Sequence, residues 1–246
     1  IEYNAMLNAV PFTPEEIDSY LWMIVLSIDF RSYHTVTHTL LTSHISIIMA
    51  ELLHYSKKEI ETIKIATLLH DIGKSGIPIE ILEAPRRLTD YEMRTVRRHV
   101  NMTEHILDGN IDRQVSDIAI HHHEKLNGSG YPYQLTKEIL NQQEAIVAVA
   151  DILSALVAKR SYKDAWPKEK TIGVLKEMVD TGELDPKAVA IAVEHYDMII
   201  ARVSDAGKAT TRRYQKIMNE YDDLLERIQR SNAPLITSKL GELNRI

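Results

Sequence analysis

The sequence contains no cysteine, which excludes disulfide bonds, thiolate catalysis and zinc–thiolate sites. Glycine and proline are few, at nine and eight residues among 246, and no proline- or serine-rich linker divides the chain. The formal net charge is −6, so no global basic field attracts a nucleic-acid polymer. The longest apolar stretch, residues 20–28, is too short to cross a bilayer, and we expect no membrane segment.

The chain begins with Ile1 rather than Met, and no signal peptide is recognisable. We therefore expect a fragment of a longer protein, with a sensory module as the candidate for the upstream part. The 246 residues are 44% hydrophobic and can bury a substantial core. We predict one all-α domain over residues 1–246, with a motif-bearing core at about 31–165 and C-terminal helices over 168–231. The charged tail is predicted to be a packing or dimerisation helix.

Signals for helix starts recur along the chain. A Thr, Ser or Asn followed three residues later by Glu forms a capping box, and this signal occurs at Thr13, Ser56, Thr89 and Asn141. No segment of five or more residues alternates clearly between apolar and polar side chains, so at most incidental strand is expected. The sequence predicts a bundle of eight to nine helices, with a short turn near 78–83 and helices at 14–29, 32–54, 57–71, 89–107, 112–123, 143–162, 168–181, 186–203 and 208–231.

The segment His70-Asp71-Ile-Gly73-Lys74 is the most informative in the chain. Adjacent His and Asp at the end of a helix can share a metal ion, and an apolar stripe in the preceding helix directs this pair inward. Glycine then ends the helix. Lys74 lies one turn beyond His70, so its ammonium could reach a phosphate held by the metal. A surface lysine is the alternative interpretation.

Further candidate ligands lie elsewhere in the chain. His34 and His38 share a helix face because they are four residues apart, and His99 is another candidate. Consecutive helical residues point about 100° apart, so the run 121–123 cannot place all three imidazoles on one ion. We favour His122 and His123 as ligands and interpret the first histidine of the run as a bystander.

Asp151 interrupts an apolar helical run. A carboxylate there is costly to bury unless it is paired or bound to a metal, although a solvent-facing Asp remains an alternative. Arg160 and Lys163 follow two to three turns later, where cations gain from the helix dipole and would also suit phosphate binding. Four other histidines have no partner in the sequence and are interpreted as surface or core residues: His44, His54, His105 and His195.

The candidate ligands are imidazoles and carboxylates, which suit iron, manganese, nickel or zinc. They are numerous enough for two ions, with Asp71 as the natural bridge. Two ions about 3.5–4 Å apart can hold a hydroxide, because they lower the pKa of water from 15.7 towards roughly 7. The residues therefore predict metal-dependent hydrolysis of a phosphate ester.

Two ordered motifs resemble those of the HD-GYP phosphodiesterases, a branch of the HD metallohydrolase superfamily. Residues 70–74 are similar to the family's HD-x-G-K element, and residues 122–132 are similar to its HHE…GYP element. The resemblance covers about residues 34–163. It implies an all-helical fold, two or three bound metals, and hydrolysis of cyclic dinucleotides, chiefly cyclic di-GMP, in the bacterial cytoplasm.

The resemblance also implies metal ligands, residue by residue. One ion would be held by His38, His70, Asp71 and Asp151. The second would be held by His99, His122 and His123, with Asp71 shared. His34 matches a position where some members place a Glu for a third ion, so two ions and three both stay open.

Substrate contacts follow from the same resemblance. Lys74 matches a lysine near the scissile phosphate, and with Asp71 it forms the predicted catalytic pair. The other predicted substrate contacts are Gly130 and Tyr131 in the loop over the substrate, together with the basic residues Arg160 and Lys163. Two positions depart from the family pattern, since Asn127 and Ser154 each replace an Asp. Neither departure removes an expected ligand.

We therefore predict a metal-dependent phosphodiesterase that opens cyclic di-GMP to linear pGpG, with further cleavage to GMP left open, through a hydroxide bridging the metals. Iron or manganese is the first choice, with nickel or zinc as alternatives. The alternative substrate is 3′,3′-cyclic GMP–AMP. Three competing hypotheses are a catalytically weak nucleotide sensor, a hydrolase of nucleoside triphosphates or guanosine tetraphosphate, and a metal-free scaffold. A second copy of the chain and a diguanylate cyclase or other signalling protein are candidate partners.

Overall fold

The computed structural model describes residues 33–158 and 166–204 continuously, with the side chains of residues 33–36 excepted. Isolated positions are described between 13 and 25 and between 216 and 227. Contacts divide the chain into residues 1–203 and residues 204–246, and each unit is described by itself. The predicted helices at 14–29 and 208–231 lie largely outside the described residues. The prediction of one domain over residues 1–246 stays a prediction.

The described residues form an all-α structure, as predicted, and their only β-type contact is an isolated bridge between Asn127 and Thr136. The labelled helices, including one 3-10 helix labelled η1, are α3 (Tyr33–Leu52), α4 (Lys57–Leu69), η1 (Ile72–Gly76), α5 (Ile79–Leu82), α6 (Asp90–Arg97), α7 (His99–Leu107), α8 (Arg113–Ile120), α9 (Gln142–Val157), α10 (Lys168–Asp180) and α11 (Pro186–Glu194). Residues 196–204 are also helical, so the predicted helix 186–203 is interrupted at His195.

The predicted capping boxes are present at the starts of three of these helices. Ser56 begins α4, Thr89 begins α6 and Asn141 begins α9, and in each the Glu side chain returns a bond to the main chain of the cap. Each box satisfies main-chain N–H groups that have no partner inside the helix. At the described positions Thr13 and Glu16 the reciprocal bonds are also formed.

Several predicted helices differ from the structure at their ends. The predicted helix 89–107 was wrong as one element, since Arg98 separates α6 from α7. The predicted helix 112–123 ends at Ile120, so His122 and His123 follow the helix instead of lying on it. The predicted helix 57–71 likewise ends at Leu69. Capping signals mark helix starts, whereas the sequence carries no equally strong signal for these ends.

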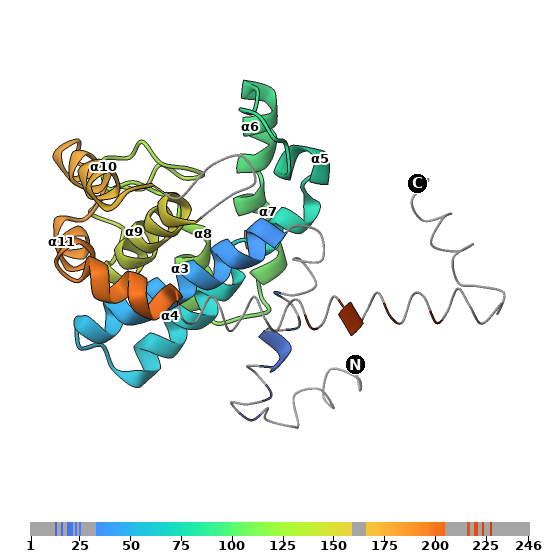
Figure 1. Cartoon of the computed structure of the whole chain (residues 1–246), viewed down its shortest axis with the longest axis horizontal. Helices are drawn as coiled ribbons and strands as arrows, with labels where there is room; N and C mark the ends of the chain where they lie inside the picture. The colour runs from blue at the N-terminus through green and yellow to red at the C-terminus, as the bar shows by residue number, and fades with distance from the viewer. Residues whose placement is uncertain are drawn as a thin grey trace. The chain divides into compact units, whose positions relative to one another are not determined.

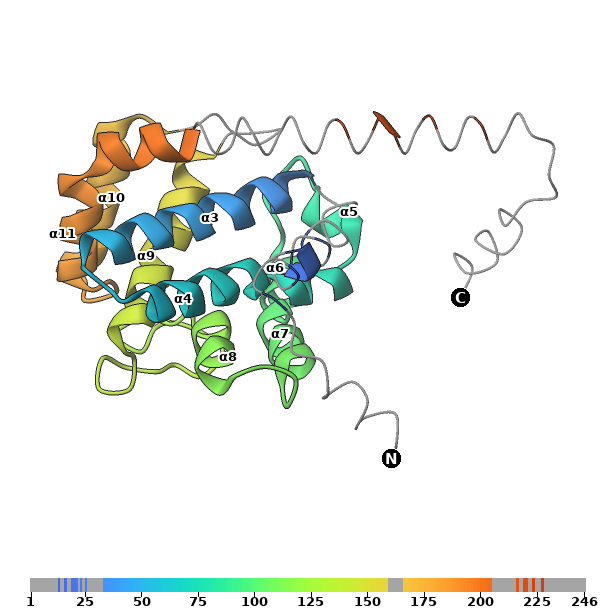
Figure 2. The same cartoon turned by 90° about the horizontal axis from the view of Figure 1, so that it is seen from below.

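Helices α3 and α4 form an antiparallel hairpin, and α9 packs against α3 (Figures 1 and 2). Helix α8 packs on α4, while α7 packs on η1, the segment that follows α4. This arrangement brings the start of α3 and the end of α4 to the same region, close to α7. The chain thereby collects residues from distant parts of the sequence around the end of α4.

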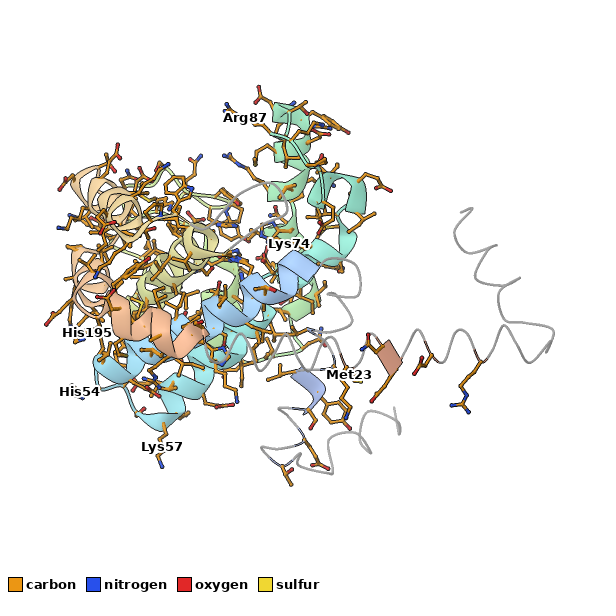
Figure 3. All side chains as sticks on the ribbon, viewed as in Figure 1. Met23, His54, Lys57, Lys74, Arg87 and His195 are labelled. Atoms are coloured by element: carbon orange, nitrogen blue, oxygen red, sulfur yellow. The ribbon has the colours of Figure 1, made fainter. Side chains whose placement is uncertain are left out.

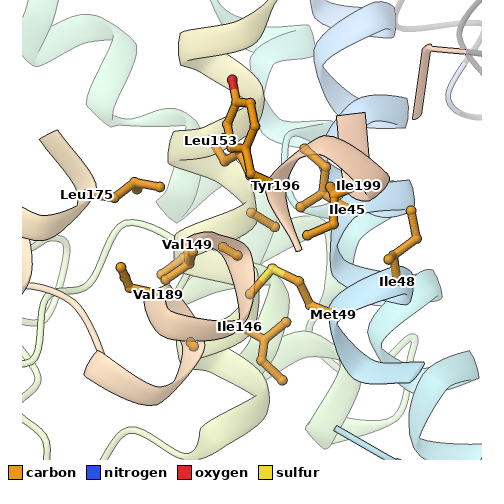
Figure 4. Packing of buried hydrophobic residues seen from close by; sticks show 14 of the residues in the cluster. Ile45, Ile48, Met49, Ile146, Val149, Leu153, Leu175, Val189, Tyr196 and Ile199 are labelled. Atoms are coloured by element: carbon orange, nitrogen blue, oxygen red, sulfur yellow. The ribbon is translucent and has the colours of Figure 1, made fainter. Parts of the chain in front are cut away.

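The apolar core lies between α3, α9, α10 and α11, and Figure 4 shows its packing. Ile45 and Met49 of α3 meet Ile146 and Leu153 of α9, and Val189 closes the layer from α11. Helix α9 is apolar on almost every side, which is the pattern of a buried helix. Each fully buried side chain of this size contributes about 1.5–3 kcal/mol. No helix among the described residues is long and apolar enough to span a membrane.

Candidate metal centre

Seven of the eight predicted metal ligands come together around two buried carboxylates. All are buried except one imidazole, which is half-buried. His38 lies on α3, and His70 and Asp71 follow the end of α4. His99 begins α7, His122 and His123 lie in the turn after α8, and Asp151 lies on α9. The eighth, His34, has its side chain outside the described residues.

Asp71 lies at the middle of this cluster. Its Oδ1 is 3.3 Å from Nε2 of His99 and 3.9 Å from Nε2 of His122. Its Oδ2 is 3.2 Å from Nε2 of His70 and 3.8 Å from Nε2 of His38. Each oxygen of Asp71 therefore faces a different pair of imidazoles, which is the arrangement that a carboxylate bridging two ions needs.

Asp151 forms a second anionic point on the α9 side. Its Oδ1 is 2.9 Å from Nε2 of His38 and 3.7 Å from Nε2 of His70. Its Oδ2 is 3.6 Å from Nδ1 of His123. Asp151 thus faces imidazoles from both halves of the cluster, and it does not face solvent.

Three of the imidazoles are oriented by main-chain carbonyls at helix ends. In each case Nδ1 bonds the carbonyl three residues earlier, in the last turn of a helix, where carbonyls have no helical partner. A carbonyl only accepts, so Nδ1 carries the proton and the lone pair on Nε2 points into the cluster. The bonds are His70 to Thr67 at 2.6 Å, His99 to Val96 at 2.6 Å and His122 to Ala119 at 2.7 Å.

This arrangement leaves polar atoms without partners inside the described protein. His70 Nε2, Asp71 Oδ1 and Asp151 Oδ1 are buried and make no hydrogen bond. Leaving such a group unpaired costs about 1–3 kcal/mol, and more when it is charged. A cation among these lone pairs removes that cost, so the donor set fits divalent metal ions. Two groups have all their ligand atoms within 4.8 Å of one another, namely His38/His70/Asp71 and His99/His122/His123.

The electrostatics favour the charged carboxylates and, at two of the histidines, the neutral imidazoles that metal binding requires. His70 and Lys74 hold the pKa of Asp71 well below its usual value, although burial opposes this. His38 does the same for the pKa of Asp151. Burial lowers the pKa of His123 to about 3, and burial also lowers the pKa of His122. The carboxylates stay charged and these imidazoles stay neutral at physiological pH.

Glycine at position 73 lets α7 approach the end of α4. A Cβ on Gly73 would lie 2.0 Å from the carbonyl oxygen of His99 and 2.5 Å from the nitrogen of Thr103. The Thr103 hydroxyl donates to the carbonyl of His70 and accepts from the Gly73 N–H, both at 3.0 Å. The glycine of the first motif therefore fixes where His99 enters the cluster.

Lys74 follows on η1, and its ammonium contacts Oδ2 of Asp71. In Figure 3 the labelled His54 and His195 lie toward the other end of the α3–α4 hairpin from Lys74. They take no part in the cluster, as the sequence predicted. His44 bonds its own helix through Leu40 O at 2.7 Å, and His121 bonds Glu144 Oε1 at 2.6 Å rather than Asp71 or Asp151.

The long irregular segment after α8 is held by Glu124. Its buried carboxylate accepts the N–H groups of Tyr133 at 2.6 Å and Leu135 at 2.9 Å. Gly130 passes so close to Glu124 that a Cβ added to the glycine would lie 2.5 Å from the Cα of Glu124. Asn127, one of the two departures from the family pattern, donates from its amide to the carbonyl of Thr181 at 3.0 Å, which a carboxylate could not do.

Tyr131 forms a wall beside the cluster. Its ring lies 4.7 Å from the ring of His123, with 31° between the planes. The guanidinium carbon of Arg97 lies 4.9 Å from the centre of the Tyr131 ring. Burial, and then the charges of Asp151 and Asp71, raise the pKa of Tyr131.

Sequence reasoning missed two residues near the centre. Arg97 had only its position two residues before His99 as a signal. Ser154 was noted only as a departure, yet its Oγ lies 2.8 Å from Nδ1 of His38. The predicted contacts Arg160 and Lys163 lie outside the described residues.

Comparison with known proteins then identifies the family. A model of the HD domain matches residues 25–188, which is more than half of the chain. This chain belongs to the HD domain family. The curated relatives of this chain include cyclic di-GMP phosphodiesterases, which confirms the HD-GYP resemblance of its motifs. That family is metal-dependent, in agreement with the fit of the donor set.

Two of these relatives illustrate the similarity. The HD domain chain is 36% identical over 167 residues to the cyclic di-GMP phosphodiesterase response regulator RpfG of Xanthomonas campestris, covering 66% of this chain and 44% of that protein. It is 37% identical over 199 residues to the 3′3′-cGAMP-specific phosphodiesterase 2 of Vibrio cholerae, covering 79% and 38%. The chain thus spans less than half of the length of either relative.

Solved structures share the fold. The HD domain chain resembles Bd1817, an HDG"Y"P protein from Bdellovibrio bacteriovorus, with a TM-score of 0.57, 18% identity, and coverage of 75% of this chain and 65% of that one. It also resembles the HD domain of the phosphodiesterase PgpH from L. monocytogenes in complex with cyclic-di-AMP, with a TM-score of 0.53, 16% identity, and coverage of 80% and 100%. At these identities the likeness establishes the helical architecture alone.

Proposed function

We propose that this chain binds two divalent metal ions and hydrolyses a phosphodiester bond of a cyclic dinucleotide. One observation carries the proposal: the two oxygens of Asp71 face separate pairs of imidazoles. Two ions held there would lower the pKa of bound water and neutralise the charge of a phosphodiester. The relatives are named for hydrolysis of cyclic di-GMP and of 3′3′-cGAMP, which supports this substrate class.

The proposed ligands divide between two ions. His38, His70 and Asp151 would hold one, while His99, His122 and His123 would hold the other, with the carboxylate of Asp71 shared. Imidazole and carboxylate donors favour iron or manganese, with nickel or zinc as the alternatives. Buried atoms without hydrogen-bond partners lie on both sides of this division: His70 Nε2 and Asp151 Oδ1 at the first ion, and Asp71 Oδ1, which faces His99 and His122, at the second.

Cationic and aromatic side chains would bind the substrate. Lys74 lies beside Asp71. Its ammonium would donate to a non-bridging phosphate oxygen and stabilise the negative charge of the reacting phosphate. Arg97 supplies a second cation on the wall formed by Tyr131. Gly130 lets the loop that contains Tyr131 pass close to the main chain of Glu124. This loop would shape the pocket and limit the access of water.

The first choice of substrate is cyclic di-GMP, and the alternative is 3′,3′-cyclic GMP–AMP. Both share the phosphodiester ring on which the metal centre would act, and relatives carry both names. The immediate product would be a linear dinucleotide, pGpG in the case of cyclic di-GMP. Bases are discriminated by pocket contacts away from the metals, so the same centre serves either substrate.

A turnover assay tests the proposal directly. The metal-depleted chain is reloaded with Mn²⁺ and incubated separately with cyclic di-GMP, 3′,3′-cyclic GMP–AMP and cyclic di-AMP, and products are separated by chromatography. We expect a linear dinucleotide from at least one guanine-containing substrate, and none after chelation. His38→Gln should abolish turnover, whereas the matched control His44→Gln on the same helix should retain it. Protein with two bound ions that cleaves none of the three would refute the proposal and favour a nucleotide sensor.

A further inference from the structure

His38 is held differently from the three fully buried imidazoles of the described centre. His70, His99 and His122 each bond a main-chain carbonyl at the end of a helix. His38 lies inside α3, where the carbonyls of the preceding turn accept helical hydrogen bonds. Its Nδ1 instead lies 2.8 Å from the hydroxyl oxygen of Ser154 on α9. The orientation of His38 therefore depends on a side chain from another helix.

The bonds around Ser154 assign the proton of His38. The Ser154 Oγ is 2.8 Å from the main-chain oxygen of Asp151 and 2.7 Å from Oγ1 of Thr42. A hydroxyl has one proton and two lone pairs, and the Asp151 carbonyl can only accept, so it takes the Ser154 proton. The lone pairs then accept from the Thr42 hydroxyl and from the Nδ1–H of His38. Ser154 and Thr42 are fully buried, so no solvent competes for these bonds.

This assignment turns the lone pair of His38 Nε2 toward the centre. With the proton on Nδ1, Nε2 faces Asp151 Oδ1 at 2.9 Å as a second acceptor. Two acceptors at that distance repel each other unless a cation lies between or beside them. Ser154 thereby prepares His38 for metal in the way that the helix-end carbonyls prepare the other three imidazoles.

We propose that Ser154 is a positioning residue that fixes His38 in its Nδ1–H tautomer, and so sets the metal affinity of the site that His38 shares with Asp151. The inference rests on the proposed metal centre. Asp151 and Ser154 lie one turn apart on α9, so a single helix supplies one ligand and orients another. Thr42 on α3 completes the arrangement by occupying the remaining lone pair of Ser154.

Titration of the metal-depleted chain with Mn²⁺ gives the first test. Removing the partner of a ligating imidazole typically weakens metal binding about 10–100-fold, and we expect that loss for one of the two ions in Ser154→Ala. The second ion should bind as in the unmodified chain. Thr42→Val should weaken the same ion to a smaller extent, and Thr42→Ser, which keeps the hydroxyl, should restore it. Unchanged affinity in Ser154→Ala would overturn the inference.

Measuring the tautomer of His38 distinguishes a positioning role of Ser154 from a merely structural one, because a structural role would leave the tautomer unchanged. Long-range ¹H–¹⁵N spectra of the metal-depleted chain distinguish the two neutral forms of an imidazole, and a His38→Gln spectrum assigns the signal. We expect the Nδ1–H form in the unmodified chain. In Ser154→Ala we expect a shift to the Nε2–H form, because Asp151 Oδ1 can accept that proton. The same tautomer in both proteins would contradict the proposal.

Ser46→Ala is the matched control. Ser46 is also a fully buried serine, on α3, and its hydroxyl makes no hydrogen bond within the described part of the chain. This variant should leave Mn²⁺ affinity and the His38 tautomer unchanged, and an equal loss in both serine variants would overturn the inference. If Ser154→Ala fails to fold by circular dichroism, the Thr42→Val and Thr42→Ser pair decides.

Neither readout involves a nucleotide, so the two proposals can fail separately. If the unmodified chain binds two Mn²⁺ ions with the expected His38 tautomer but cleaves no cyclic dinucleotide, the proposed function fails and the role of Ser154 stands. If turnover is found but Ser154→Ala changes neither affinity nor tautomer, the proposed function stands and the role of Ser154 fails.

Discussion

The apolar core and the metal centre are both buried, and helix α9 contributes side chains to both. Ile146 and Leu153 pack into the core among other apolar side chains. Asp151 faces the centre, where three buried polar atoms make no hydrogen bond. The core is held by contacts between apolar groups, whereas the buried charges of the centre need a cation beside them. Stability should therefore depend on the first region and activity on the second, and four predictions test that separation.

The largest effect is expected from Asp71→Asn. An amide has only one oxygen and no negative charge, so it cannot bridge two cations as a carboxylate does. Turnover of a cyclic dinucleotide should fall by about 10²–10³-fold, the scale of losing a main electrostatic contact. Bound Mn²⁺ should fall as well, while the circular dichroism spectrum stays helical. Turnover within tenfold of the unmodified chain would break the assignment of Asp71 as the bridge.

Gly73→Ala tests whether the geometry of the centre depends on the contact between α4 and α7. The added methyl would meet the carbonyl of His99, and a displacement near 1 Å at a reacting site can cost about 10²-fold in rate. Gly173→Ala on α10 is the control, since a Cβ there meets nothing within 4 Å. It should keep full activity and stabilise the chain by about 0.5–1 kcal/mol. Equal loss of turnover in both variants would show that the geometry of the centre does not depend on the contact between α4 and α7.

Leu175→Ala tests the opposite side of the comparison. Leu175 is fully buried in the apolar core on α10, and replacing a buried Leu by Ala costs about 2–5 kcal/mol. Denaturant unfolding should show that loss, while the folded protein binds two Mn²⁺ ions as before. A fall in metal stoichiometry at temperatures where the variant is folded would show that the two regions are coupled.

The smallest effect concerns pH. Burial lowers the pKa of His123 to about 3 and also lowers that of His122, whereas unfolded imidazoles titrate near 6.5. The unfolded chain then binds more protons, so the stability of the metal-free protein should fall as pH drops below about 6.5. His70, whose pKa is raised by Asp71 despite burial, partly offsets this. Denaturant unfolding at pH 7.5 and 5.5 measures the slope, which should be smaller in His123→Gln. An equal slope in the variant and in the unmodified chain would contradict the role assigned to His123.

Much of the fold could be predicted from the sequence, because its signals are local. Capping boxes at Ser56, Thr89 and Asn141 mark helix starts through bonds spanning three residues. Helix ends were less predictable, since no side-chain cap marks the break at Arg98 and α8 ends at Ile120 without a glycine or proline after it. Local patterns specify elements, and tertiary contacts adjust their limits.

For the centre, residue types and motifs were enough to nominate ligands but not the groups that orient them. The side chains of His38 and Asp151 lie together as expected. Nothing in the sequence could link His38 to Ser154, because α3 and α9 are more than a hundred residues apart and the link is tertiary. Likewise, Arg97 meets Tyr131 only because the loop after α8 folds back toward α6.

Crystals of the full chain grown with Mn²⁺ and measured at the manganese absorption edge would test the central claim most directly. The account predicts two anomalous peaks, one beside His38, His70 and Asp151 and one beside His99, His122 and His123, with Asp71 between them. Ordered side chains in the present arrangement with no anomalous peak among them would contradict it.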